Sequence, residues 1–222
     1  MAYDLVQQPV RPALSASLRA VVAEEGSASH PYFGTLTQRD APMRDLADAA
    51  HFLCMLHARF PGLIDLARNH SPAAPMSEWL EAAAGAFANE RAFLVRLAAA
   101  AGPLPSTPGQ DACDAAIQTQ HHALDMLGRS DRMGCAAGAA LALVSDWASC
   151  RRLLEIVADR VGLEAPDDML TTGSDVISIL DTLDPRPALE RAMRFGAQQL
   201  VLQHRALWDI LEARSEARQA ML

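Results

Sequence analysis

The stretch Asp131–Val161, DRMGCAAGAALALVSDWASCRRLLEIVADRV, decides the predicted fold and lies within the longest proline-free part of the chain. Apolar and small residues recur in it at steps of four and three, the spacing of one continuous face of an α-helix. They are Ala136, Ala140, Leu143, Trp147, Cys150, Leu154, Val157 and Val161. Residues 134–144 are apolar almost all round, which is typical of a helix enclosed by other helices. We therefore predict a central helix.

The ends and the opposite side of this helix also carry signals. Ser130 or Asp131 is the predicted N-cap, and Gly162 is the predicted end. Gly134, Gly138 and two serines on the opposite side are small enough to admit a second backbone or a flat ligand.

Composition predicts one all-α domain over residues 1–222. Half of the residues are hydrophobic but only 5% are aromatic, and the abundant alanine favours closely packed helices. β-branched residues nowhere alternate with polar ones over the length of a strand, so we expect no sheet. A single compact multi-helix bundle is the predicted fold class.

The net charge and the N-terminal sequence indicate which partners and which cellular compartment to expect. The net charge is −8, and all 19 basic residues are arginines without a basic stripe, which argues against a nucleic-acid partner. The N-terminal residues MAYDLVQQPVRP show no signal-peptide pattern, and the apolar run 135–144 is about half of a bilayer span. We therefore expect a cytoplasmic protein with no membrane partner. The four cysteines are isolated and are predicted to be free thiols.

Periodicity and breakers place the other helices in order along the chain. The predicted ranges are 12–24, 43–60, 63–69, 78–101, 111–128, 175–183 and 184 to about 218. The last of these has Asp184 as its N-cap and Pro185 in its first turn. Residues 26–42 are predicted to form a loop that wraps the surface or acts as a lid.

Four polar side chains fall on helix faces that are otherwise apolar: His57, Glu90, His121 and His204. One interpretation is that these groups pair with one another or with water in an inert core. The alternative is a site inside the bundle. A metal held by all four is one version of that site, with ligand types that suit iron or zinc but without a spacing signature.

Other polar residues carry less weight. Asp48 and His51 are predicted to form a solvated pair, and His122 and Asp125 are predicted to be exposed. Asp146 lies on the flank of the central helix, where an arginine could pair with it. The chain contains no GxGxxG, Walker loop, GxSxG or HExxH motif, and no glutamate is followed three residues later by histidine.

Two stretches resemble the heme-oxygenase-like helical superfamily, which includes the TenA and PqqC proteins. In GCAAGAALALVSDWASCRRLLE, Gly134 and Gly138 resemble glycines of a distal helix that lies over a planar ligand. FGAQQLVLQHRALWDILEAR, residues 195–214, resembles the last long helix of TenA proteins. Gln203 or His204 stands where that helix has its glutamate, and His57 is the candidate for an axial histidine. The resemblance implies a heme-oxygenase-like bundle; a ferritin-like four-helix bundle is the alternative.

Two functions remain open on the sequence. The first is binding of a small molecule or cofactor between helices, with or without catalysis, by His57, Glu90, His121, Gln203, His204, Gly134 and Gly138. The ligand and cofactor are not specified by the sequence. The second is a non-catalytic homodimer whose polar core is structural and whose contact face includes Trp79 or Trp208.

Overall fold

Helices account for all regular structure that the computed structural model describes, which covers residues 13–70, 74–170, 180 and 186–221. The all-α prediction is therefore confirmed for these residues. The helices are α1 (Leu14–Glu25), η1 (Ser27–Ser29), α2 (Pro31–Leu36), α3 (Met43–His57), α4 (Leu63–Ala67), η2 (Arg68–His70), α5 (Ala74–Ala100), α6 (Gln110–Gly128), α7 (Cys135–Val161) and α9 (Pro187–Gln219).

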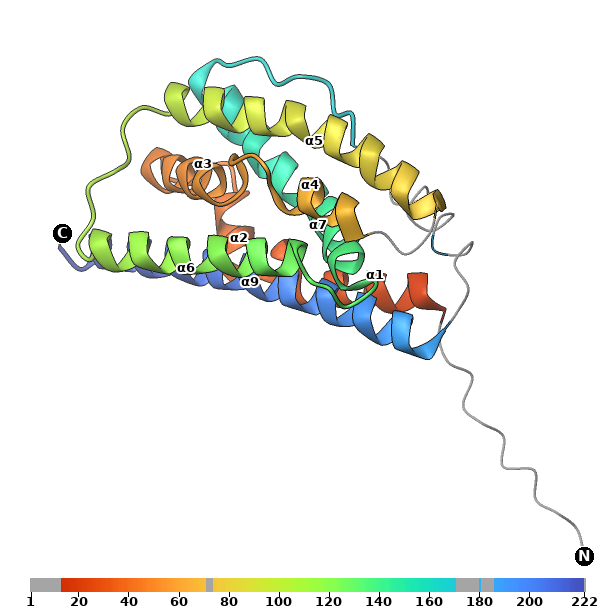
Figure 1. Ribbon diagram of the computed structural model, residues 1–222. Coiled ribbons are helices and arrows are strands. Elements are labelled where there is room, and N and C mark those ends of the chain that lie inside the picture. The colour runs from red at the N-terminus through yellow and green to blue at the C-terminus, as the bar shows by residue number, and fades with distance from the viewer. Residues whose placement is uncertain (1–12, 71–73, 171–179, 181–185, 222) are drawn as a thin grey trace, which may run out of the picture.

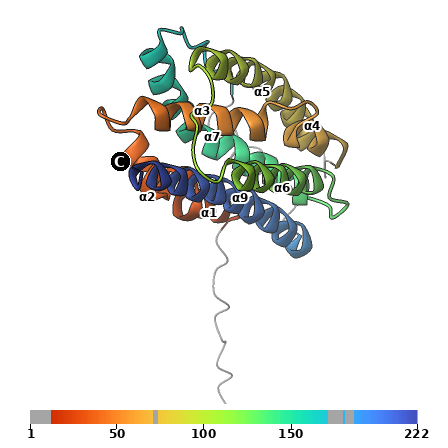
Figure 2. The same cartoon turned by 90° about the vertical axis from the view of Figure 1, so that its left-hand side faces the viewer.

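The predicted central helix is α7, which runs through the middle of the bundle between α5 on one side and α9 on the other (Figures 1 and 2). It contacts α1, α3, α4, α5, α6 and α9. The predicted seam residues from Ala136 to Val157 are at most 1% exposed, because neighbours cover the helix on nearly every side. Gly162 ends the helix in the left-handed conformation, as predicted.

The start of α7 differs from the prediction. The helix begins at Cys135, after Gly134 with φ of 90°, rather than at a cap on Ser130 or Asp131. Glycine adopts a positive φ more readily than other residues, and this non-helical conformation of Gly134 sets the start of α7 at Cys135.

Two glycines let α7 and α9 cross with their backbones in contact. A Cβ on Gly138 would collide with the Met193 carbonyl, and one on Gly196 would collide with the Cys135 carbonyl. The small side of α7 therefore admits a second backbone, and the alternative of a flat ligand over Gly138 is wrong for this conformation. This crossing fixes the position of α9 against the central helix.

Several segment boundaries depart from the predictions. Residues 26–42 contain η1 and α2, since Pro31 opens a short helix that buries Tyr32, Phe33 and Leu36. Helix α5 begins at Ala74, before the predicted start at residue 78, and α3 ends at His57, before the predicted end at residue 60. The predicted helix 175–183, apart from Leu180, and the predicted cap at Asp184 lie outside the described residues.

An arginine cluster joins α3 to the C-terminal end of α9. Arg214 donates two hydrogen bonds to the Asp48 carboxylate, at 2.9 and 3.1 Å, and Arg218 bonds both Asp48 and Asp45. The prediction that Asp48 forms a solvated pair with His51 is wrong, because α9 covers this side of α3 and Asp48 is 1% exposed. His51 instead contacts the Gly102 carbonyl oxygen at 2.8 Å.

The buried apolar residues form one continuous core from Leu18 in α1 to Leu211 in α9. Trp79 and Trp208 belong to this core, with 4% and 0% exposed, so the expectation that one of them forms a contact face is wrong. Among the described helices, none has both the length and the apolar character to cross a membrane.

Candidate functional site

The two predicted core histidines meet in the middle of the bundle. His57 closes the last turn of α3, His204 lies on the inner face of α9, and their Nε2 atoms are 3.0 Å apart. The ring centroids are separated by 5.0 Å, which means that the two nitrogens face each other nearly head-on. The two side chains touch rather than enclose a ligand-sized space, so a shared ligand site of His57 and His204 stays a prediction.

Asp146 of α7 holds the other side of His204. One carboxylate oxygen lies 2.5 Å from His204 Nδ1 and accepts a hydrogen bond of 2.5 Å from the Ser27 hydroxyl. The other oxygen accepts the Ser27 backbone N–H at 2.8 Å. Gly26 permits this approach, since a Cβ there would lie 2.5 Å from the carboxylate. Asp146 therefore pairs with a histidine and a serine, and the suggested arginine partner is wrong.

The chemistry of the groups fixes the direction of the hydrogen bonds made by Trp208, Ser27 and Asp146 in this histidine chain, defined as Trp208, Ser27, Asp146, His204 and His57. An ionised carboxylate only accepts, so Ser27 Oγ and His204 Nδ1 both donate to it. Trp208 Nε1, which only donates, bonds Ser27 Oγ at 2.9 Å. The direction between the rings depends on their tautomers: when Nδ1 carries the only proton of His204, its Nε2 accepts from His57 Nε2–H.

Burial and hydrogen bonding set opposite preferences for charge at Asp146 and at His57. Burial would raise the pKa of Asp146, but the donors His204 and Ser27 outweigh it and hold that pKa below its usual value. Burial, followed by the neighbouring His204 and His121, lowers the pKa of His57 well below its usual value. The arrangement therefore holds an ionised carboxylate and a neutral imidazole.

Cys150 lies one turn after Asp146, with its sulfur 3.5 Å from Ser27 Oγ. Asp146, Cys150 and His204 form one of two groups of potential metal ligands among the described residues whose ligand atoms lie within 4.8 Å of one another. Burial, and then Asp146, raises the pKa of the Cys150 thiol well above its usual value, which disfavours the thiolate that metals and electrophiles require. Both nitrogens of His204 are already in hydrogen bonds, so a metal here would displace them.

This constellation also differs from a nucleophilic triad. Ser27 donates its hydroxyl hydrogen to the carboxylate rather than to an imidazole, whereas a serine nucleophile requires the imidazole as its base. Ser27 is 0% exposed, so a substrate could not reach it in this conformation.

Glu90, another predicted site residue, is engaged elsewhere. Trp147 Nε1 donates to its carboxylate at 2.9 Å, and Arg151 forms a buried ion pair with it. Burial raises the pKa of Glu90, while these two partners oppose that shift. The Trp147 ring packs edge-on against His57 with 5.4 Å between centroids, so an indole stands next to the imidazole where the prediction had the carboxylate.

His121 of α6 shares a small cavity with His57. The space has a volume of about 10 Å³, room for about one water molecule, and is also lined by Phe87, Leu124 and Asp125. Burial lowers the pKa of His121, although Asp125 opposes this. His122 is exposed as predicted, whereas Asp125 is half-buried. The four predicted ligands His57, Glu90, His121 and His204 therefore do not converge on one metal position.

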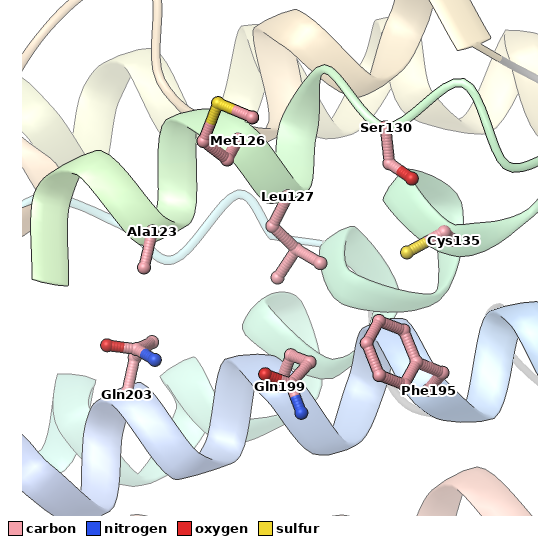
Figure 3. Close-up of a pocket in the computed structure, with 8 residues that line it drawn as sticks. All are labelled: Ala123, Met126, Leu127, Ser130, Cys135, Phe195, Gln199 and Gln203. Atoms are coloured by element: carbon pink, nitrogen blue, oxygen red, sulfur yellow. The ribbon is translucent and has the colours of Figure 1, made fainter.

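Gln203, the neighbour of His204, faces a groove between α6 and α9 (Figure 3). The groove has a volume of about 300 Å³. Figure 3 shows Gln199, Gln203 and Phe195 extending from α9 towards α6, from which Ala123 and Leu127 point back. The complete lining is Ala123, Met126, Leu127, Ser130, Cys135, Phe195, Gln199 and Gln203.

Gly134 and Gly138 lie outside the lining of this groove. Both are buried against α9, where added Cβ atoms would collide with Leu189 and Met193. Their role in the described conformation is helix packing.

Sequence reasoning did not identify Ser27, Cys150 or Gln199 as site residues. Cys150 belongs to the predicted buried face of the central helix. Asp146 lies three residues after Leu143 and four before Cys150, so Asp146 belongs to the same face. That spacing was an available signal for burial of Asp146. Ser27 follows the glycine that ends α1, and no comparable signal marks it.

A family model matches residues 22–219, which is nearly the whole chain. The chain belongs to the DUF6975 family, a family of unknown function. No match was found among curated proteins or among solved structures. The comparisons therefore establish membership of this family and assign no activity to the histidine chain or to the groove.

Proposed function

We propose that this protein binds a small uncharged molecule with an apolar body in the groove between α6 and α9. The observation that carries the proposal is a hollow of about 300 Å³ whose eight lining side chains are all uncharged. This volume lies at the lower end of the range for small-molecule sites. Heme-oxygenase-like architecture remains compatible with such a site and is part of the proposal.

The lining determines the class of ligand. Met126, Leu127 and Phe195 offer apolar contact, while the amides of Gln199 and Gln203 each offer a donor and an acceptor. None of the lining side chains is charged, so a charged ligand would lose hydration without an opposite charge inside the groove, which is unfavourable. The groove therefore fits a ring or short chain that carries one neutral group able to donate and accept, such as a carboxamide.

The interior offers less support for a ligand. The cavity beside His57 and His121 has about 10 Å³, and the histidine chain is closed by its own hydrogen bonds. We assign to the histidine chain the role of fixing α9, and hence Gln203, relative to α3 and α7. Catalysis is not part of this proposal.

Three molecules of similar shape test the proposal: benzamide, benzoate and benzylamine. Saturation-transfer NMR and backbone amide shifts should detect benzamide in the groove, with weaker binding of the two charged analogues. Replacing Gln203 with leucine should weaken benzamide binding by roughly two- to tenfold, the loss of one hydrogen bond of about 0.5–1.5 kcal/mol. The control is Gln118→Leu, since Gln118 is exposed on α6 and outside the groove lining.

Shifts confined to residues around the groove, in the order benzamide above benzoate and benzylamine, would support the proposal. Absence of binding by all three probes, or equal binding of benzoate and benzamide, would contradict it.

A further inference from the structure

The outer face of α9 exposes two large apolar side chains. Phe195 is 44% exposed and Leu202 is 43% exposed, seven residues apart and therefore on one stripe of the helix. Ala206 and Ala213 continue the same stripe towards the C-terminus. Arg132 covers one side of the Phe195 ring, with its guanidinium 5.7 Å from the ring centroid. A surface of this kind is typical of a contact with another helix.

Charged side chains along one flank of this stripe change sign halfway along α9. Arg191 and Arg194 lie in the N-terminal half. Asp209, Glu212 and Glu216 lie on the same flank in the C-terminal half. Asp209 is paired with His30 at 3.0 Å but keeps a 63% exposed side chain. One flank of the helix therefore carries two complementary halves.

A two-fold axis across the middle of α9 would bring these halves together. In an antiparallel pair of helices related by such an axis, each flank faces the same flank of the partner. With the axis near residues 203–204, Arg194 faces Glu212 of the partner subunit and Arg191 faces the partner's Glu216. The same axis places Phe195 opposite the partner's Ala213, and Leu202 opposite the partner's Ala206.

We propose that a second copy of this chain docks on the outer face of α9, with the two α9 helices antiparallel. The apolar stripe supplies packing of large side chains against small ones, and the charged flanks set the direction and register of the pair. Arg205 lies near the axis, where the nearest flank residue is the partner's Arg205, so the ion pairs of Arg191 and Arg194 have to outweigh this like-charge contact. The proposal goes beyond the ligand groove: Gln199 and Gln203 point to the α6 side of the helix (Figure 3), and of the stripe residues Phe195 also lines the groove.

Charge reversal with mixing tests both the dimer and its direction. Sedimentation velocity at low salt should give the wild type twice the 23.9 kDa mass of one chain. Arg194→Glu alone and Glu212→Arg alone should each weaken the dimer by at least about tenfold, because like charges then face each other at both contacts. Mixing the two variants should restore the dimer, since every contact again joins opposite charges.

Two further variants test the apolar stripe. Leu202→Glu should also yield monomers, whereas Val95→Glu should not, since Val95 is 55% exposed on α5 away from this face. Circular dichroism of each variant separates loss of the dimer from loss of the fold. A monomeric wild type, dimers that resist both charge reversals, or a mixture that stays monomeric would each overturn the proposal. None of these variants lies in the ligand groove, so benzamide binding reports on the proposed function separately.

Discussion

Two buried polar regions hold α9 in the bundle, and they use different chemistry. In the arginine cluster of Asp45, Asp48, Arg214 and Arg218, carboxylates meet guanidinium groups in direct ion pairs. In the histidine chain, the carboxylate of Asp146 meets a serine hydroxyl, a backbone N–H and an imidazole. Both carboxylates, Asp48 and Asp146, are 1% exposed.

The difference lies in how each region responds to protons. Burial lowers the pKa of Arg214, but its hydrogen bond to Asp48 and the charge of Asp48 more than offset this, so the pKa is raised. Arginine therefore stays charged at any ordinary pH. Imidazole gains its charge near neutrality, and the buried His57 resists that gain. One region is a permanent attachment, and the other is sensitive to acid.

Removing Asp48 should have the largest effect on stability. The variant Asp48→Ala leaves Arg214 and Arg218 with a single remaining acid partner, and breaking a buried ion pair in this way costs about 3–5 kcal/mol. Urea unfolding followed by circular dichroism measures the loss. As a control, Asp131→Ala changes an exposed acidic residue and should stay within about 0.5 kcal/mol. A loss below 1 kcal/mol for Asp48→Ala, on the order of one neutral hydrogen bond, would mean that the cluster is not a strong attachment.

Replacing Asp146 should have a smaller but clear effect. In Asp146→Asn the amide nitrogen faces donors, so at least one hydrogen bond from Ser27 or His204 is lost, at a cost of about 1–3 kcal/mol. The same urea measurement applies. The matched control is Asp125→Asn, whose carboxylate is 3.7 Å from His121 near the surface and should contribute about 0.5 kcal/mol or less. If the two substitutions cost the same, the histidine chain does not stabilise the core.

Acid should weaken the fold gradually through His57. The unfolded chain binds a proton at His57 near pH 6.5, while the folded chain does not, so the unfolded state holds more protons below that pH. The free energy of unfolding should therefore fall as pH decreases below about 6.5, by at most about 1.4 kcal/mol per pH unit for one histidine. His121 acts in the same direction, and Asp146 adds a further loss below its ordinary pKa of 3.8.

The variant His57→Gln tests this assignment, because glutamine can still donate to His204 but does not titrate. Its unfolding free energy should depend less on pH between 6.5 and 5 than that of the wild type. His70→Gln serves as the control, because His70 is half-buried and lies outside the histidine chain. An unchanged slope in His57→Gln would assign the acid sensitivity to another group.

The sequence predicted which side chains are buried more reliably than which side chains meet. Helical periodicity places His57, Glu90 and His204 on inner faces, and all three are at most 5% exposed. Periodicity does not identify the helix that covers a face. For this reason Asp48, which belongs with Arg214 from 166 residues away, was predicted to be solvated. Tyr32, Phe33 and Leu36 after Pro31 have helical spacing, but that helix is too short for a periodic signal.

The sequence also indicated only part of the site, because helical periodicity does not show which helices pack together. Two helices with inward histidines favoured a shared site for His57 and His204, but the sequence did not indicate that the two rings touch. The placement of Trp147 between Glu90 and His57 depends on how α5 and α7 pack, which a single helix face does not specify. The closure of the Gly138 face depends on Gly196 in another helix, so a lone glycine pattern is ambiguous between a ligand and a neighbour.

The most direct test of the histidine chain is the nitrogen NMR spectrum of its two imidazoles at pH 7.5, with assignments from single-histidine variants. His204 should carry its proton on Nδ1 with a bare Nε2, and His57 should carry its proton on Nε2. In Asp146→Asn, His204 should lose its fixed tautomer while His57 stays neutral. An Nε2–H tautomer for His204, or a doubly protonated His204 beside a His57 with bare Nε2, would contradict two neutral imidazoles in the histidine chain.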